Sequence, residues 1–161
     1  MTFRTILKYS GTVLAVAIIG LILIQFIPVN TTNPPVVSEP NWDSPQTRAL
    51  AQRACFDCHS NETEWPSYAK IAPISWVIAN HVAEGREKLN FSDWRSVRAE
   101  KTNEAIEVIL EGSMPPLYYT AIHPTARLTP AEKQALVDGL RATFQNTSQI
   151  STNDTVSQSG K

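Results

Sequence analysis

The sequence predicts an all-α domain that follows one N-terminal transmembrane helix. Three observations support this class: an uncharged apolar run from Gly11 to Ile27, later apolar positions at helical spacings, and no good strand pattern. The chain has 161 residues, enough for one ordinary domain with additional segments.

The apolar run at residues 11–27 predicts a membrane span. It has no charged side chain, and as a helix it would extend about 26 Å, close to a hydrocarbon core about 30 Å thick. Arg4 and Lys8 precede it, so we expect residues 1–10 in the cytoplasm and the rest across the membrane. A cleaved signal peptide has the same charge order, but this run ends without a small-x-small site. We therefore expect an uncleaved single-pass anchor in a bacterial inner membrane.

Composition divides the remaining chain into three parts. Residues 28–42 contain four prolines and predict an extended linker. Residues 146–161 are polar and low in complexity, which predicts a disordered tail. The folded domain is then expected at residues 43–145. The net charge of −1 gives no electrostatic support to a nucleic-acid partner.

Four helices are predicted within this domain. The first runs toward Ala54 from Ser44 as its N-cap and Pro45 at its first position. The second covers about 73–89, with a predicted buried stripe at Ile74, Val77, Ile78, Val82 and Leu89.

The third and fourth helices have equally clear ends. The third begins near Thr102 and ends at Gly112, a residue type favoured after helix C-termini. Thr129 caps the fourth, with Pro130 at its first position and Glu132 completing a capping box. Its predicted buried stripe is Ala135, Leu136, Leu140 and Phe144.

The stretch CFDCH, residues 55–59, is the candidate functional motif. C-x-x-C-H is the attachment signature of c-type haem, in which each thiol forms a thioether with a haem vinyl group. The adjacent histidine then becomes the proximal iron ligand. Cys55, Cys58 and His59 fit this arrangement.

Three other interpretations of the motif remain at this point. A redox dithiol normally accompanies a βαβ pattern, which the sequence lacks. A zinc site needs four ligands, and only His81 and His123 remain to complete one. A structural disulfide is the third. Export would favour haem, because haem is attached to such motifs outside the bacterial plasma membrane.

Two residues are candidates for the opposite side of the iron. Met114 follows the helix ended by Gly112 and precedes two prolines, so its thioether can be presented from a loop. His81 is the alternative, because its position in the second helix predicts an inward-facing side chain. His123 precedes a proline and is expected in a turn.

Longer stretches carry a family resemblance. The order of C-x-x-C-H, helices, Met-Pro loop and closing helix resembles the small class I cytochromes c. The stretches ACFDCHSNETEWPSYAKIAPISWVIANHVAEGREKLNFSDW (54–94) and GSMPPLYYTAIHPTARLTPAEKQAL (112–136) resemble the bacterial haem-binding domain family, over roughly residues 41–141. That resemblance implies covalent haem at Cys55 and Cys58, with His59 proximal and Met114 distal.

The class I analogy also implies supporting roles. The carbonyl of Pro66 or Pro73 would accept the other ring N–H of His59. Several aromatic residues would line the haem or pack in the core: Trp65, Trp76, Trp94, Tyr118 and Tyr119. Arg86 and Lys88 would meet the haem propionates or be solvated.

The expected function is that of a membrane-anchored c-type cytochrome. It would carry single electrons between membrane or periplasmic redox proteins through one haem c, with the domain on the periplasmic side. The alternative is an open-site haem sensor or peroxidase-like enzyme in which Met114 is displaceable or does not bind the iron. A haem-free interaction module is the third possibility.

Overall fold

The computed structural model describes residues 3–158, with side chains described at residues 9–98 and 100–146. In this part of the chain the regular structure is helical, and no strand forms beyond an isolated bridge between Ser38 and Asp93. The prediction of an all-α protein is therefore confirmed. The chain divides into a first unit, residues 1–32 and 65–81, and a second unit, residues 33–64 and 82–161.

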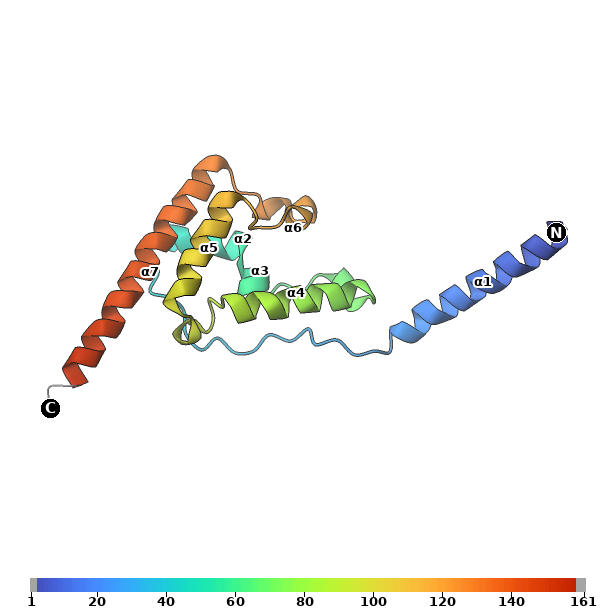
Figure 1. Ribbon diagram of the computed structural model, residues 1–161, viewed down its shortest axis with the longest axis horizontal. Helices are drawn as coiled ribbons and strands as arrows, with labels where there is room; N and C mark the ends of the chain where they lie inside the picture. The colour runs from blue at the N-terminus through green and yellow to red at the C-terminus, as the bar shows by residue number, and fades with distance from the viewer. Residues whose placement is uncertain (1–2, 159–161) are drawn as a thin grey trace. The chain divides into compact units, whose positions relative to one another are not determined.

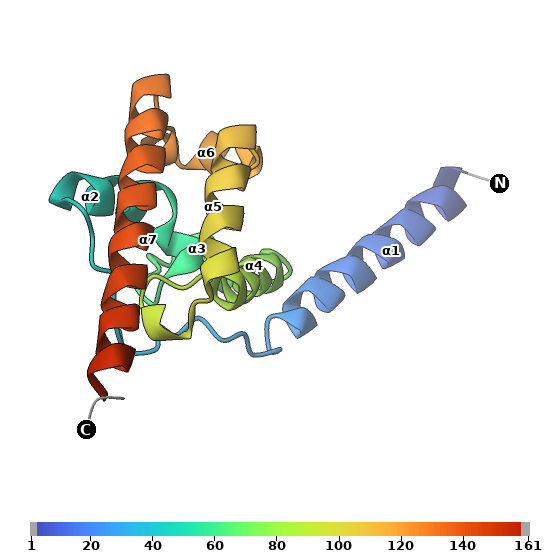
Figure 2. The ribbon, with the colours of Figure 1, turned by 60° about the vertical axis from the view of Figure 1, so that its left-hand side comes forward.

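The second unit contains most of the helices. They are α2 (Pro45–Ala54), the one-turn α3 (Phe56–His59), α5 (Ala99–Glu111), α6 (Leu117–Ile122) and α7 (Pro130–Gln158). The first unit contains α1 (Phe3–Ile24), and α4 (Ile74–Lys88) contributes residues to both units. Short 3-10 turns cover Ser67–Lys70, Trp94–Ser96 and Pro124–Ala126. Both α2 and α5 pack against α7 (Figures 1 and 2).

The predicted helix caps are confirmed, although α5 begins at Ala99 and not near Thr102. The Ser44 side chain accepts a hydrogen bond from the backbone N–H of Thr47, 3.2 Å away. At the start of α7, the Glu132 carboxylate accepts the Thr129 N–H at 2.8 Å, and the Thr129 hydroxyl accepts the Glu132 N–H at 3.2 Å. Gly112 ends α5 with φ of +83°, a conformation in which a Cβ would be strained.

A ladder of aromatic rings forms the centre of the second unit. Phe91 stacks on Phe56 at 5.5 Å between centroids and on Trp94 at 5.9 Å. Trp94 in turn stacks on Phe144 of α7 at 5.2 Å. Of the two roles considered for Trp94, the structure therefore gives it core packing. The ladder ties α3, which carries the C-x-x-C-H motif, to the long closing helix.

Several elements differ from the sequence prediction. On α7 the buried stripe includes Val137 in place of the exposed Ala135. On α4 the predicted buried residues Ile74 and Val77 are exposed, whereas Val82 is buried. Helix α7 continues to Gln158, through most of the predicted disordered tail. Residues 146–158 contain neither proline nor glycine, so no strong helix breaker ends it there.

The first unit begins with α1, which includes most of the predicted membrane span. Among the residues that the structure describes, no helix combines the length and the hydropathy needed to cross a membrane. The transmembrane anchor at residues 11–27 is therefore not confirmed and stays a prediction. Residues 28–42 form no helix. Residues 33–42 belong to the second unit, where the Val37 N–H donates to the Ser92 carbonyl at 2.8 Å and Trp42 packs against the core, so a linker over all of 28–42 stays a prediction.

Candidate functional site

The C-x-x-C-H motif forms a single helical turn directly after α2. Cys55 ends α2 by donating its N–H to the Ala51 carbonyl at 2.8 Å, and its own carbonyl accepts the His59 N–H at 2.9 Å. Within the turn, Phe56 points into the core and is 2% exposed. Cys55, Cys58 and His59 are each half-buried. Phe56 therefore anchors the turn in the core, while the side chains of Cys55, Cys58 and His59 remain partly accessible.

Both thiols are free in the structure. Burial raises the pKa of Cys55 to about 12 and is also the main reason why the pKa of Cys58 rises to about 11, with the Asp57 carboxylate adding to it. A redox dithiol or a zinc-binding pair depends on thiolates with lowered pKa values. Burial shifts the pKa values of Cys55 and Cys58 in the opposite direction. Among the described residues, no group of three histidine, cysteine or acidic side chains is placed to hold a metal ion.

The His59 ring is fixed by two backbone carbonyls at the end of α4. Its Nδ1 lies 2.9 Å from the Gly85 oxygen and 3.1 Å from the Leu89 oxygen. A carbonyl can only accept, so Nδ1 carries the proton. Burial lowers the pKa of His59 and keeps the imidazole neutral. The lone pair of Nε2 is then available to a metal, the usual arrangement of a ligating histidine.

Gly85 allows α4 to lie close to the C-x-x-C-H motif. A Cβ at this position would collide with the Cys58 carbonyl oxygen and lie 3.1 Å from the Cys58 Cβ. Arg86, the next residue, donates to the Ser60 carbonyl at 2.7 Å and to the Thr63 hydroxyl at 2.9 Å. Arg86 therefore stabilises the chain segment that follows His59. This role differs from the two that were expected, propionate binding and solvation.

Asp57, between the two cysteines, links the motif to the Met-Pro region. The Tyr119 hydroxyl of α6 donates to Asp57 Oδ2 at 2.6 Å, and the Glu64 N–H donates to Oδ1 at 2.9 Å. Burial is the main reason why the pKa of Tyr119 rises, followed by this hydrogen bond. Tyr119 also stacks on His123 at 4.3 Å between ring centroids. Tyr119 thus connects the motif directly to α6.

Met114 lies in the loop between α5 and α6. Its N–H donates to the Val108 carbonyl at 3.1 Å, and its half-buried side chain packs against the same core as Cys55. The structure therefore places Met114 and the motif on one core within the second unit. His81 is also half-buried, but it belongs to the first unit. His123 caps the end of α6, in agreement with its expected place in a turn.

Helix α6 exposes an apolar surface after the Met-Pro loop. It has no buried residue, and Leu117 and Ile122 are 84% and 63% exposed. Apolar side chains this accessible are suited to contact a large apolar group. Leu117 and Ile122 are therefore accessible to an apolar ligand or partner.

Comparison with known families agrees with this chemistry. The sequence model of a family described as a haem-binding domain matches residues 19–142, more than half of the chain. The chain belongs to the haem-binding domain family. Its cofactor is therefore haem. A search of curated proteins and a search of solved structures found no match.

Sequence reasoning missed the residues that orient the motif of this haem-binding domain. The acceptors of the His59 N–H are the carbonyls of Gly85 and Leu89, whereas the carbonyls of Pro66 or Pro73 had been expected. A backbone carbonyl carries no side-chain signal. A glycine in the middle of a predicted helix was the available indication, because such a glycine often marks a close approach.

Substitution of Gly85 tests this packing in the haem-binding domain. We expect Gly85→Ala to lower the free energy of unfolding by about 1–3 kcal/mol, because α4 must move away from Cys58. Haem incorporation should fall as well, since the Gly85 carbonyl orients His59. Thermal unfolding and the haem-to-protein absorbance ratio measure both effects. Glu87→Ala, on the exposed side of α4, is the control, and equal behaviour of the two variants would contradict this account.

Substitution of Tyr119 tests the link between the motif and α6. We expect Tyr119→Phe to cost about 1.5–3 kcal/mol of unfolding free energy, because the Asp57 carboxylate loses a charge-assisted hydrogen bond. Tyr118→Phe provides a matched control on the neighbouring residue, which is 61% exposed, and should change stability by less than about 0.5 kcal/mol. Chemical denaturation measures both values, and a Tyr119→Phe variant as stable as the wild type would refute the link.

Proposed function

We propose that this protein is a c-type cytochrome that carries single electrons through one covalently bound haem. The observation that carries the proposal is the fixed His59 ring, with Nδ1 held by two carbonyls and Nε2 left for iron. This ring follows directly on two free thiols in one helical turn. The redox partners would be membrane or periplasmic proteins.

The cysteines and the histidine of the motif would bind the haem in different ways. Cys55 and Cys58 would attach it through thioether bonds to its two vinyl groups, which the C-x-x-C spacing matches. The neutral His59 would bind the iron through Nε2.

Met114 is the proposed ligand on the opposite side. It follows the αL turn at Gly112, and its amide is fixed on the last turn of α5. The hydrogen bond from Tyr119 to Asp57 restrains the helix that follows. Haem iron bound by histidine and methionine supports electron transfer at a raised reduction potential. Two protein ligands leave no open coordination site for a substrate.

We further propose that the N-terminal segment attaches the protein to a bacterial inner membrane. Residues 11–27 are uncharged, and large apolar side chains of this segment are exposed, including Val13 and Phe26. The basic residues before the segment favour a cytoplasmic N-terminus and a periplasmic haem domain. That side of the membrane is also where covalent haem attachment takes place.

Two variants and one gas test the proposed ligation. We expect Met114→Ala to abolish the weak absorption near ~695 nm that is typical of a Met–Fe(III) bond, and His81→Ala to retain it. The ferrous wild-type protein should not bind carbon monoxide rapidly, whereas the Met114→Ala variant should. A wild-type spectrum without this band, together with rapid carbon monoxide binding gained in His81→Ala and not in Met114→Ala, would assign His81 as the ligand. Rapid carbon monoxide binding by the wild type would favour the open-site sensor or enzyme.

A further inference from the structure

The first unit exposes a second apolar surface apart from α1. Ile71, Ile74 and Val77 are 54%, 51% and 54% exposed. Ile74 and Val77 lie three residues apart on α4, so they share one face of the helix. We call these three residues the 71–77 face. Ile74 and Val77 belong to the predicted buried stripe of the second predicted helix, whereas Ile71 precedes it.

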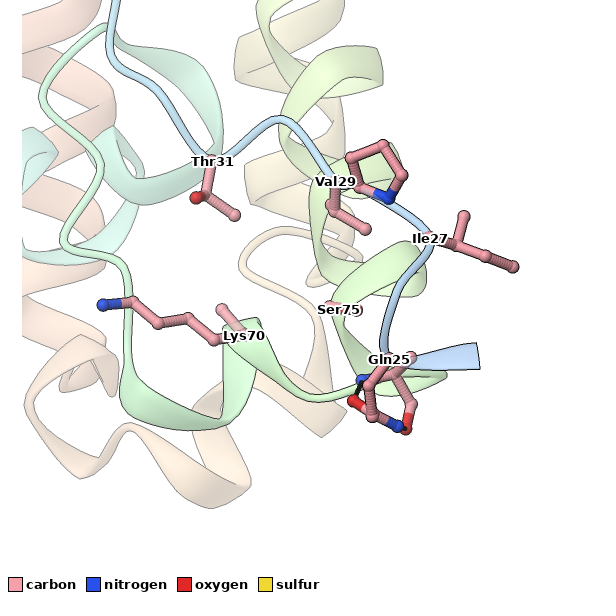
Figure 3. Close-up of a pocket in the computed structure, with 9 residues that line it drawn as sticks. Gln25, Ile27, Val29, Thr31, Lys70 and Ser75 are labelled. Carbon is pink, nitrogen blue, oxygen red and sulfur yellow. Dashed lines mark hydrogen bonds between the residues drawn. The ribbon is translucent and has the colours of Figure 1, made fainter. Parts of the chain in front are cut away.

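Gln25 fixes this face beside the end of α1. Its Nε2 donates to the Ala72 carbonyl at 3.1 Å, and its Oε1 accepts the Ala72 N–H at 2.9 Å. Figure 3 shows the junction, where a cavity of about 170 Å³ is lined by Gln25, Ile27, Lys70 and Ser75 among others. Phe26 and Ile27, the two residues after Gln25, also have exposed apolar side chains. The hydrogen bonds between Gln25 and Ala72 therefore connect two segments with exposed apolar side chains.

The charges of the first unit all have one sign. Its two segments contain Arg4, Lys8 and Lys70 but no aspartate or glutamate, so the fifteen acidic residues of the chain all lie in the second unit. Arg4 and Lys8 would lie on the other side of the membrane, so Lys70 supplies the basic charge of residues 65–81, a segment without acidic side chains that anionic lipid would repel. Residues 65–81 also contain Trp65, Tyr68 and Trp76, residue types enriched where protein meets the membrane–water interface.

We propose that the 71–77 face lies against the surface of an anionic lipid bilayer, as a second point of attachment beside α1. A lipid partner is favoured because the hydrogen bonds between Gln25 and Ala72 hold the face beside the end of α1 and because residues 65–81 contain no acidic side chain. This inference rests on the proposed membrane attachment of the N-terminal segment.

Photo-crosslinking with lipid tests this proposal on the full haem-loaded chain. Vesicles of phosphatidylcholine and phosphatidylglycerol would contain a phospholipid with a photoreactive acyl chain, and mass spectrometry would locate the labelled peptides. We expect labels on α1 and on residues 66–80. The double variant Ile74→Asp/Val77→Asp should lose about tenfold or more of the label on residues 66–80, because two aliphatic contacts are replaced by anions. Leu110→Asp, at an exposed apolar position of the second unit, is the matched control.

The outcomes separate this inference from the proposed attachment. Label on α1 without label on residues 66–80 would overturn the 71–77 face as a lipid contact and leave the attachment of α1 intact. Label on neither segment would overturn both. A dimer in detergent that Ile74→Asp/Val77→Asp abolishes, together with unlabelled residues 66–80, would assign the face to a second copy of the chain. Unchanged haem absorbance in both variants would confirm that they fold.

Discussion

The hydrogen bonds from His59 Nδ1 to the carbonyls of Gly85 and Leu89 are the interaction on which the site depends. They determine which ring nitrogen carries the proton and which one is free for iron. They require the end of α4 to lie against the motif, which is possible because Gly85 has no Cβ. Two further interactions hold the motif in place: the hydrogen bond from Arg86 to the Ser60 carbonyl and the stacking of Phe56 on Phe91.

The two cysteines of the motif are free and lie in a partly buried turn beside the fixed histidine. Burial keeps both thiols protonated, and neither forms a disulfide. The match to the haem-binding domain family over residues 19–142 establishes haem as the cofactor. The local geometry adds what a family match cannot give, namely how this chain orients its proximal histidine and how Asp57 ties the motif to α6 through Tyr119.

Sequence patterns predicted the helix caps, because a cap depends on residues that are close together in the chain. Ser44, Thr129 with Glu132, and Gly112 mark helix ends because their own backbone and side-chain geometry ends a helix. The partners of His59 could not be predicted, because they are carbonyls brought near by packing of distant segments. The same limit explains α4, where regular spacing predicted burial of Ile74 and Val77 but could not show that these side chains stay exposed among the residues that the structure describes.

The most direct test of this account is the intact mass of the denatured chain, produced in a host with cytochrome c maturation. The account predicts that one haem remains bound after denaturation and extraction with acidified organic solvent. It also predicts that a Cys55→Ala/Cys58→Ala chain has the mass of the polypeptide alone. Complete extraction of haem from the wild-type chain, leaving the polypeptide mass, would contradict covalent attachment and with it the central claim.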